Sequence, residues 1–221
     1  MAETVRPPEF SPQVETAQIL LRNGVFEIAD SPIYPWSGGL MSPIYSNVRL
    51  VNGDVDGRTK VTDFLVSETQ KKEKPDFIAG VVSAGLPWAD NLANRLRLPM
   101  IPVRPEPKDH GTGGQIDGRI GFGDHGIAVE DTISTGGSVF KSIRALRLAG
   151  ARVDTALAIL DYQLFDSAQK AKDQSVRITA LTNFPTVIEV AERDGYWDRN
   201  TVAFVKDWYK DPVAWAENFR D

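Results

Sequence analysis

The sequence predicts an α/β fold in which a twisted parallel sheet carries helices on both of its faces. From Asp76 onward, short apolar runs alternate with amphipathic segments of helical period, and this alternation places successive strands side by side in one parallel sheet. The length of 221 residues suits one such domain with a small appendage. A composition with 42% hydrophobic and 25% charged residues is that of a globular chain and not of a disordered one.

The same pattern places the individual elements. Residues 25–50 mix glycines, prolines and aromatic side chains, which indicates short strands and loops. Pro87 suits the first turn of a helix, and Gly150 follows the end of another. The expected strands are 77–82, 100–103, 126–129, 153–160 and 176–181. The expected helices are a first one with Val14 to Leu21 on its apolar face that ends at Asn23 and Gly24, then 56–69, 87–96, 139–148 and a last one that begins at Asp211 and Pro212.

The composition excludes several classes of function. The absence of cysteine excludes disulfides, thiolate zinc sites, iron–sulfur clusters and cysteine nucleophiles, and two histidines leave little room for a histidine-rich metal site. A net charge of −5 argues against broad nucleic-acid binding, because polyanions need a positive surface. No apolar run approaches the ~18 residues of a membrane span, and the polar first residues are unlike a signal peptide. We therefore expect a cytoplasmic protein with neither a nucleic-acid nor a membrane partner.

The strongest chemical signal is the segment 126–138, GIAVEDTISTGGS. An apolar strand is expected to end in two adjacent carboxylates, Glu130 and Asp131, before a turn rich in hydroxyls and glycine that begins a helix. The backbone N–H groups of such a turn, with the helix N-terminus, form an anion site. The acids would repel a polyphosphate held there alone, but they suit sugar hydroxyls or Mg²⁺ bound to them. A ribose 5-phosphate unit has that combination of groups, and neither a Walker loop nor a G-x-G-x-x-G turn is present.

This segment resembles the phosphoribosyl pyrophosphate (PRPP) signature of the type I phosphoribosyltransferases. The resemblance implies that the turn binds the 5-phosphate of PRPP. It also implies that Glu130 and Asp131 hold the ribose hydroxyls or their Mg²⁺, with Asp131 among the catalytic residues. The PRPP-binding residues that it implies are Glu130, Asp131, Thr132, Ile133, Ser134, Thr135, Gly136, Gly137 and Ser138.

A second segment, 104–118, is rich in glycine and proline and has no apolar period, which predicts a long loop between strands. Its K-D-H-G-x-G-G-x-x-x-G pattern resembles the catalytic loop of the orotate phosphoribosyltransferases. In that family the loop closes over the site of the neighbouring subunit, where its basic side chains meet the pyrophosphate. The resemblance implies catalytic roles for Arg104, Lys108 and His110, with closure that excludes water.

Two further segments resemble the same family. Residues 82–87 follow the first expected core strand and resemble its pyrophosphate loop, which implies a role for Ser83, Ala84 and Gly85. Residues 37–49 resemble its orotate-site segment. The residues that the resemblance assigns to the base are Ser42, Pro43, Ile44, Tyr45 and, after the fourth strand, Tyr162.

The chain departs from the family where the base is recognised. Trp36 stands where orotate enzymes usually carry Lys, and Pro105 stands where many carry a second basic residue. Tyr162 replaces an arginine that reaches the orotate carboxylate, and a tyrosine cannot supply that charge. Losing one charge-assisted hydrogen bond costs about 1.5–3 kcal/mol unless another cation substitutes. Arg49, or a cation of the loop, is the expected substitute.

Three interpretations follow from the sequence. The first is an orotate phosphoribosyltransferase, the second a phosphoribosyltransferase for another base, which Trp36 and Tyr162 favour, and the third a non-catalytic PRPP-sensing regulator. The resemblance covers roughly residues 25–165. It implies Mg²⁺ as cofactor, PRPP and a nucleobase as substrates, and a homodimer with shared sites. The regions it implies are an N-terminal hood subdomain at 1–50, a PRPP-binding core at 51–181 and an aromatic, helical C-terminal segment at 182–221.

Overall fold

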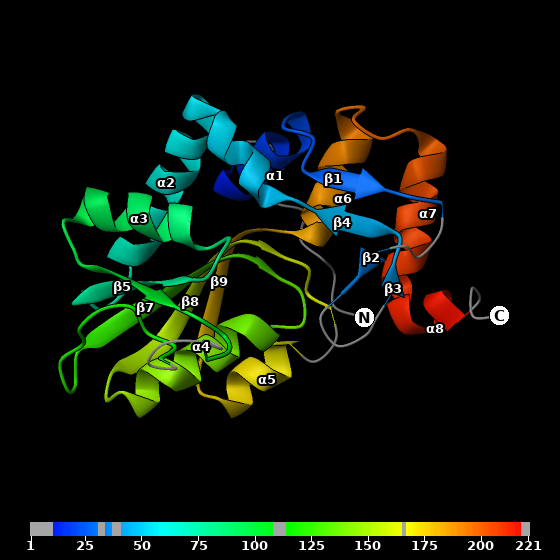
Figure 1. Cartoon of the computed structure of the whole chain (residues 1–221). Coiled ribbons are helices and arrows are strands. Elements are labelled where there is room, and N and C mark those ends of the chain that lie inside the picture. The colour runs from blue at the N-terminus through cyan, green and yellow to red at the C-terminus, as the bar shows by residue number, and fades with distance from the viewer. Residues whose placement is uncertain (1–10, 31–33, 37–40, 108–113, 165–166, 218–221) are drawn as a thin grey trace. The chain divides into compact units, whose positions relative to one another are not determined.

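A computed structural model describes residues 11–30, 34–36, 41–107, 114–164 and 167–217. The chain divides into two compact units, which Figure 1 draws in one frame. The terminal unit comprises Met1–Asp54 and Thr182–Asp221, and the sheet unit comprises Val55–Leu181. The boundaries expected at 50/51 and 181/182, and the role of the first region as a hood, stay predictions.

A five-stranded parallel sheet with the strand order β6-β5-β7-β8-β9 forms the centre of the sheet unit (Figure 1). Within it, Val81 of β5 lies opposite Val103 of β6, and Gly80 lies opposite Val129 of β7. All five expected strands are present, so the prediction of an α/β fold is confirmed. The strands are β5 (Phe77–Val81), β6 (Met100–Val103), β7 (His125–Ile133), β8 (Arg152–Asp161) and β9 (Arg177–Asn183).

Helices cover both faces of this sheet. In Figure 1, α2 and α3 lie on one face and α4 and α5 on the other. The inward side chains of α4, Val139, Ile143 and Leu146, are buried against the strands, as their spacing predicts. The short α5 was not expected. The helices are α2 (Val55–Gln70), α3 (Leu86–Leu96), α4 (Gly137–Leu148) and α5 (Ser167–Asp173).

The strand β7 is longer than expected, and one prediction about it was wrong. The sequence predicted that the strand stops at Val129 and that the two acids follow it. Instead the ladder with β8 continues, with Glu130 opposite Ala158 and Ile133 opposite Asp161. The pairing with β5 stops at Val129. The long neighbour β8 therefore supplies backbone partners that keep the acids in extended conformation after β5 has ended.

The terminal unit joins both ends of the chain around aromatic side chains. Trp208 and Phe184 are fully buried and meet edge to face, with ring centroids 5.9 Å apart. The strands β1 and β4 pair antiparallel, as do β2 and β3. The elements are α1 (Pro12–Arg22), β1 (Phe26–Ile28), β2 (Tyr34–Pro35), β3 (Met41–Ser42), β4 (Ile44–Ser46), the 3₁₀ helix η1 (Val48–Gly53), α6 (Phe184–Arg193), α7 (Arg199–Lys210) and α8 (Pro212–Glu217).

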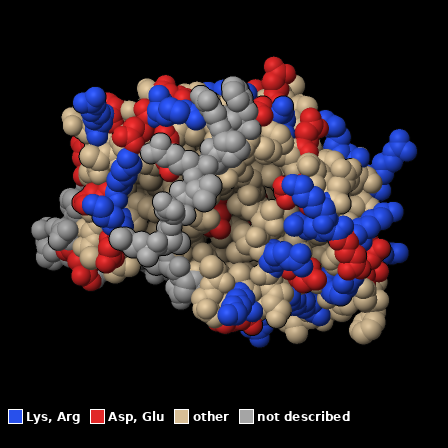
Figure 2. Space-filling view, turned by 180° about the vertical axis from the view of Figure 1, so that it is seen from behind, with Lys and Arg blue, Asp and Glu red and all other residues tan. Residues whose placement is uncertain are grey.

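Charged side chains of both signs lie on the surface of the molecule. On the face that Figure 2 presents, Lys and Arg side chains are intermingled with Asp and Glu side chains. Within the part of the chain that the structure describes, no helix is long and apolar enough to cross a lipid bilayer.

Candidate functional site

The predicted phosphate-binding residues of the sheet unit share one edge of the sheet, the carboxyl ends of its strands. The N–H of Val82, after β5, donates to the carbonyl of Val103 at the end of β6, 2.9 Å away. The segment Ser83–Gly85 and Arg104 therefore leave the sheet side by side. The N–H of Tyr162 donates to the carbonyl of Ile133 at 2.9 Å and joins the ends of β8 and β7 in the same way. Ligands of parallel α/β sheets bind outside this edge.

Carboxyl groups gather at the ends of β7 and β8. Glu130 is 7% exposed, and burial together with the neighbouring Asp131 carboxylate raises its pKa well above its usual range. Its Oε1 accepts a hydrogen bond from the N–H of Asp131 at 3.1 Å. Burial also raises the pKa of Asp161, the last residue of β8. Because burial disfavours the ionised forms of these acids, hydroxyl donors or a cation would stabilise them.

The turn after β7 leads into an open helix N-terminus. Gly136 is the N-cap residue of α4, and no side chain caps the helix there. Because the first N–H groups of a helix have no intrahelical acceptor, these groups are available to an anion. Ser134 and Thr135 are half-buried and Ser138 is exposed. The hydroxyl of Thr132 is buried and has no hydrogen-bond partner among the described residues, so a ligand atom could satisfy it.

The backbone of this turn requires glycine. Gly136 has a φ of +76°, in the left-handed region that favours glycine. A Cβ at this position would also collide with the ring of Phe140, which is buried one turn further along α4. Because both constraints require glycine at position 136, the backbone there carries no side chain, and a ligand can approach it directly.

The turn between β5 and α3 is a second open helix start. Gly85 is the N-cap residue of α3, and no side chain bonds to the helix N–H groups there. A Cβ on Gly85 would lie 2.5 Å from the carbonyl oxygen of Val129 and 2.8 Å from that of Val81. These are backbone atoms that cannot move aside, so the turn packs directly on β7. The peptide bond between Val82 and Ser83 is cis.

Arg104 brings positive charge to this edge. Its Nη2 lies 3.3 Å from the Oδ2 of Asp117. Its Nε is buried and has no hydrogen-bond partner in the described part of the chain. A guanidinium with an unmet donor beside the segment Ser83–Gly85 suits an anionic ligand. Lys108 and His110, the other predicted basic catalytic residues, lie outside the described residues.

The residues predicted to bind the base belong mostly to the terminal unit. Ser42, Pro43 and Ile44 are buried and Tyr45 is half-buried. The Ser42 hydroxyl donates to the carbonyl of Ile44 and accepts from its N–H, both at 3.0 Å. Tyr45 stacks on Tyr34, with ring centroids 5.6 Å apart. The Ser42 side chain therefore shapes the backbone, and the ring edge of Tyr45 is the more available group.

Two positions that depart from the family, Trp36 and Tyr162, and the expected substitute cation, Arg49, are held in different ways. The indole of Trp36 donates to the carbonyl of Ile44 at 3.0 Å. The exposed Arg49 donates to the Tyr45 hydroxyl at 2.9 Å and to the Oδ1 of Asn47 at 3.0 Å. Tyr162, in the sheet unit, is only 1% exposed. Arg49 is the one cation among these three residues, and it is exposed to solvent.

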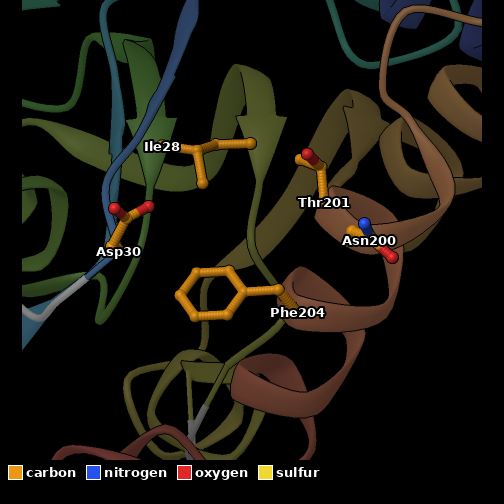
Figure 3. A pocket seen from close by; sticks show the side chains of 5 residues that line it. All are labelled: Ile28, Asp30, Asn200, Thr201 and Phe204. Carbon is orange, nitrogen blue, oxygen red and sulfur yellow. The ribbon is translucent and has the colours of Figure 1, made fainter.

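The terminal unit also contains a cavity of about 470 Å³. Figure 3 shows Ile28 and Asp30, at the end of β1, facing three side chains of α7 across it. Among the described lining residues, Asp30 is the one charged group, and a carboxylate repels phosphate. The cavity is lined by Ile28, Asp30, Asn200, Thr201 and Phe204. No described lining residue offsets the charge of Asp30, whereas Arg104 and two uncapped helix starts accompany the acids at the sheet edge, which therefore suits phosphate better.

Two groups at the sheet edge were not predicted as functional. Asp161 has a raised pKa and ends a strand beside β7. An acid directly after an apolar strand could have been predicted as a functional residue from the sequence, as Glu130 and Asp131 were. Asp117 pairs with Arg104 through the return of the loop, and only the tertiary structure could show that contact.

The chain is similar to known proteins in its family, in its sequence and in its fold. Residues 58–191 match the family model described as "Phosphoribosyl transferase domain". A Lactobacillus johnsonii protein named orotate phosphoribosyltransferase is 34% identical over 202 residues, which cover 90% of this chain and 95% of that protein. A Cutibacterium acnes protein of the same name is 37% identical over 204 residues, covering 92% and 94%.

Solved structures give the same result for the fold. The crystal structure of orotate phosphoribosyltransferase from Aeropyrum pernix matches with a TM-score of 0.67 and 30% identity, over 79% of this chain and 97% of that one. The structure of UMP synthase from Leishmania donovani matches with a TM-score of 0.77 over 89% of this chain and 42% of that one. At 21% identity, the latter supports the fold alone.

Proposed function

Because the chain belongs to the phosphoribosyltransferase family and is a transferase enzyme, we propose that it is an orotate phosphoribosyltransferase. In this reaction a ring nitrogen of orotate attacks the anomeric carbon of PRPP. The bond from that carbon to the pyrophosphate oxygen breaks, and the leaving pyrophosphate takes the electron pair. The products are orotidine 5′-monophosphate and pyrophosphate. We place the enzyme in the cytoplasm, as a homodimer whose catalytic loops reach the neighbouring subunit's site.

One observation carries this proposal, the open N-terminus of α4 next to the acids of β7. The uncapped N–H groups after Gly136 suit the 5-phosphate of PRPP. Glu130 and Asp131 precede this turn and suit the ribose hydroxyls. One ligand with a monophosphate at one end and hydroxyls nearby would satisfy both sets of groups. The names of the relatives add orotate as the base.

The leaving pyrophosphate needs positive charge. Arg104 follows β6 beside the segment Ser83–Gly85. Its Nε–H group has no hydrogen-bond acceptor among the described residues. Together with Lys108 and His110 of the loop, it would neutralise the charge that develops as the bond breaks. Neutralisation in a site closed to water matters because the sugar carbon develops oxocarbenium character.

The residues present fit a Mg²⁺ ion that arrives with PRPP. Glu130 and Asp131 offer carboxylate oxygens, the ligands that this cation prefers. The described residues contain no group of three or more His, Cys, Asp or Glu side chains able to hold a metal. Most of its ligands would therefore be oxygens of the substrate and water. When bound, Mg²⁺ adds positive charge to the pyrophosphate group.

Base selectivity is the part of the proposal that depends on the terminal unit. Arg49 is exposed and bonds to Tyr45, which belongs to the predicted base segment. Its guanidinium can bind a carboxylate through two parallel hydrogen bonds. We assign to it the role that an arginine at position 162 would otherwise have. Arg49→Ala should raise the KM for orotate at least about tenfold, or 1.4 kcal/mol, with little change in the KM for PRPP.

The direct experiment follows pyrophosphate release from PRPP and Mg²⁺ in the presence of a panel of nucleobases. Turnover that requires orotate supports the proposal. Turnover with another base alone would reassign the substrate. Tight binding of PRPP without turnover would instead favour a PRPP-sensing regulator.

The mechanism has its own test at the loop. Lys108→Ala should lower kcat at least tenfold, about 1.4 kcal/mol, because one cation that stabilises the departing group is gone. Binding of PRPP should survive, since the helix start of α4 and the acids of β7 are intact. Wild-type kcat in this variant would remove the loop from the mechanism.

A further inference from the structure

The segment that follows β6 returns beside its own start, and the two ends form a short stem, residues 102–105 and 115–117. Val103 forms an antiparallel bridge with Ile116. The N–H of Asp117 donates to the carbonyl of Pro102 at 3.0 Å. The stem therefore places residue 115 directly beside Arg104, at the carboxyl edge of the sheet.

Gln115 holds the main chain of Arg104 from both sides. Its carbonyl accepts a hydrogen bond from the N–H of Arg104 at 2.8 Å. Its side-chain nitrogen donates to the carbonyls of Arg104 and Pro105, at 3.1 Å and 3.0 Å. Because a carbonyl oxygen only accepts, the nitrogen of the amide must face the two carbonyls. One half-buried side chain thus fixes the backbone where the strand becomes the loop.

Fixing this backbone bears directly on the Arg104 side chain. An arginine side chain has many accessible rotamers, so a guanidinium on a loose backbone would sample many positions. The stem restricts it further, because Asp117 lies 3.3 Å from its Nη2. Small displacements of a charge that stabilises a transition state lower the rate strongly. A residue that holds Arg104 in place therefore contributes to catalysis without touching the substrate.

We propose that Gln115 is a positioning residue for phosphoribosyl transfer, which holds Arg104 where the leaving pyrophosphate departs. This inference rests on the proposed function. Gln115→Met keeps the length of the side chain and removes its hydrogen bonds. Gln115→Glu keeps the shape and sets carboxylate oxygens against the two carbonyls, which repels them.

Both substitutions should lower kcat at least about fivefold and leave the KM for PRPP within about twofold, because the lost interaction strengthens in the transition state. Gln169→Met is the matched control, since it removes an exposed hydrogen bond to Asp173 on α5. Its kcat should be that of the wild type. In an Arg104→Ala background, Gln115→Met should have no further effect, because a residue that acts through another is not additive with it.

Hydrogen exchange gives a readout that does not depend on turnover. The amides of Arg104 and Asp117 should exchange at least about tenfold faster in Gln115→Met, since the stem opens more often. Unchanged exchange, unchanged kcat, or a further loss in the Arg104→Ala background would each overturn the inference.

Failure of the proposed function can be told apart from failure of this inference. If the wild type turned over no base, the proposed function would fall. Titration with magnesium pyrophosphate would then decide the role of Gln115. Gln115→Met should weaken that binding at least about fivefold when Arg104 is present and leave it unchanged when Arg104 is alanine. Equal affinity in wild type and Gln115→Met would overturn the inference.

Discussion

The two units of the molecule begin their helices in different ways. In the terminal unit, side chains cap α1, α6 and α7. Ser11 accepts from the N–H of Val14 in α1, and Asn183 and Asp198 do the same at the starts of α6 and α7. In the sheet unit, α3 and α4 begin at Gly85 and Gly136, and no side chain caps either helix.

This difference separates stability from binding. A capping side chain contributes about 1 kcal/mol and occupies the position where an anion would meet the helix. The terminal unit uses that stabilisation. The sheet unit lacks it at the starts of α3 and α4, and the proposed function assigns the backbone N–H groups there to phosphate. A substitution at an open helix start should therefore lower activity, whereas a substitution at a capped helix start should lower stability and leave activity unchanged.

The largest effect is expected at the open start of α4. Gly136→Ala places a Cβ at a φ of +76° and against the Phe140 ring, so the turn must move. We expect kcat/KM for PRPP to fall at least about thirtyfold, or roughly 2 kcal/mol. Steady-state kinetics and PRPP titration would measure the loss.

The matched control is Gly150→Ala, at the other end of the same helix. Gly150 also has a positive φ, +95°, and a Cβ there would contact the exposed ring of Phe122. It should lower stability without changing kcat/KM. If both variants lost activity equally, general strain and not the phosphate turn would explain the effect.

A smaller effect with a second signature is expected at Glu130. Glu130→Gln should lower kcat at least about tenfold, or 1.4 kcal/mol, because the proposed function assigns the ribose hydroxyls to this group. It should also stabilise the fold at neutral pH. Burial raises the pKa of Glu130, so the native state binds its proton more tightly than the unfolded state.

The sign of that linkage fixes the pH window. The raised pKa of Glu130 contributes to the free energy of unfolding. This contribution is fully present below the usual pKa of 4.5 and is lost as the pH rises through the folded-state pKa. The melting temperatures of wild type and Glu130→Gln should therefore converge near pH 4 and separate above it, with the variant higher. Glu189→Gln, at an exposed acid on α6, should show no such separation. A variant that is less stable at neutral pH would contradict the buried-acid account.

The smallest effect on activity is expected at a capped start. Asn183→Ala removes the side chain that accepts from the N–H of Thr186 at 2.9 Å. It should lower the free energy of unfolding by about 1 kcal/mol, and Asn183→Gly by only a few tenths. Urea denaturation measures both values. Turnover and the KM for PRPP should stay at the wild-type level, and a loss of PRPP affinity here would remove the contrast between the two units.

Much of the sheet unit could be predicted because its signals are local. Pro87, the two glycines after Thr135 and Gly150 mark helix boundaries through their own backbone preferences. The same kind of signal was present but not used at α6, where Asn183 and Pro185 form a cap and a first turn. The length of β7 could not be predicted in this way, because β8 supplies the partners that extend it.

The candidate base segment shows the limit of such local reasoning. The resemblance assigned Ser42 to Tyr45 and Tyr162 to the base, and this assignment stays a prediction. In the structure the Ser42 hydroxyl bonds to Ile44, and Tyr162 is buried. Whether a side chain faces a ligand or the interior depends on what packs over it, and sequence spacing carries little information about that.

The sequence by itself determined the five core strands, most of the helices between them and the positions of the two acids at 130 and 131, because backbone preference and apolar period depend on neighbouring residues. Only the tertiary structure decided which acid is buried. Successive residues of a strand point to opposite faces of the sheet. Glu130 is buried and Asp131 is half-buried, and this burial, together with the neighbouring Asp131 carboxylate, raises the pKa of Glu130.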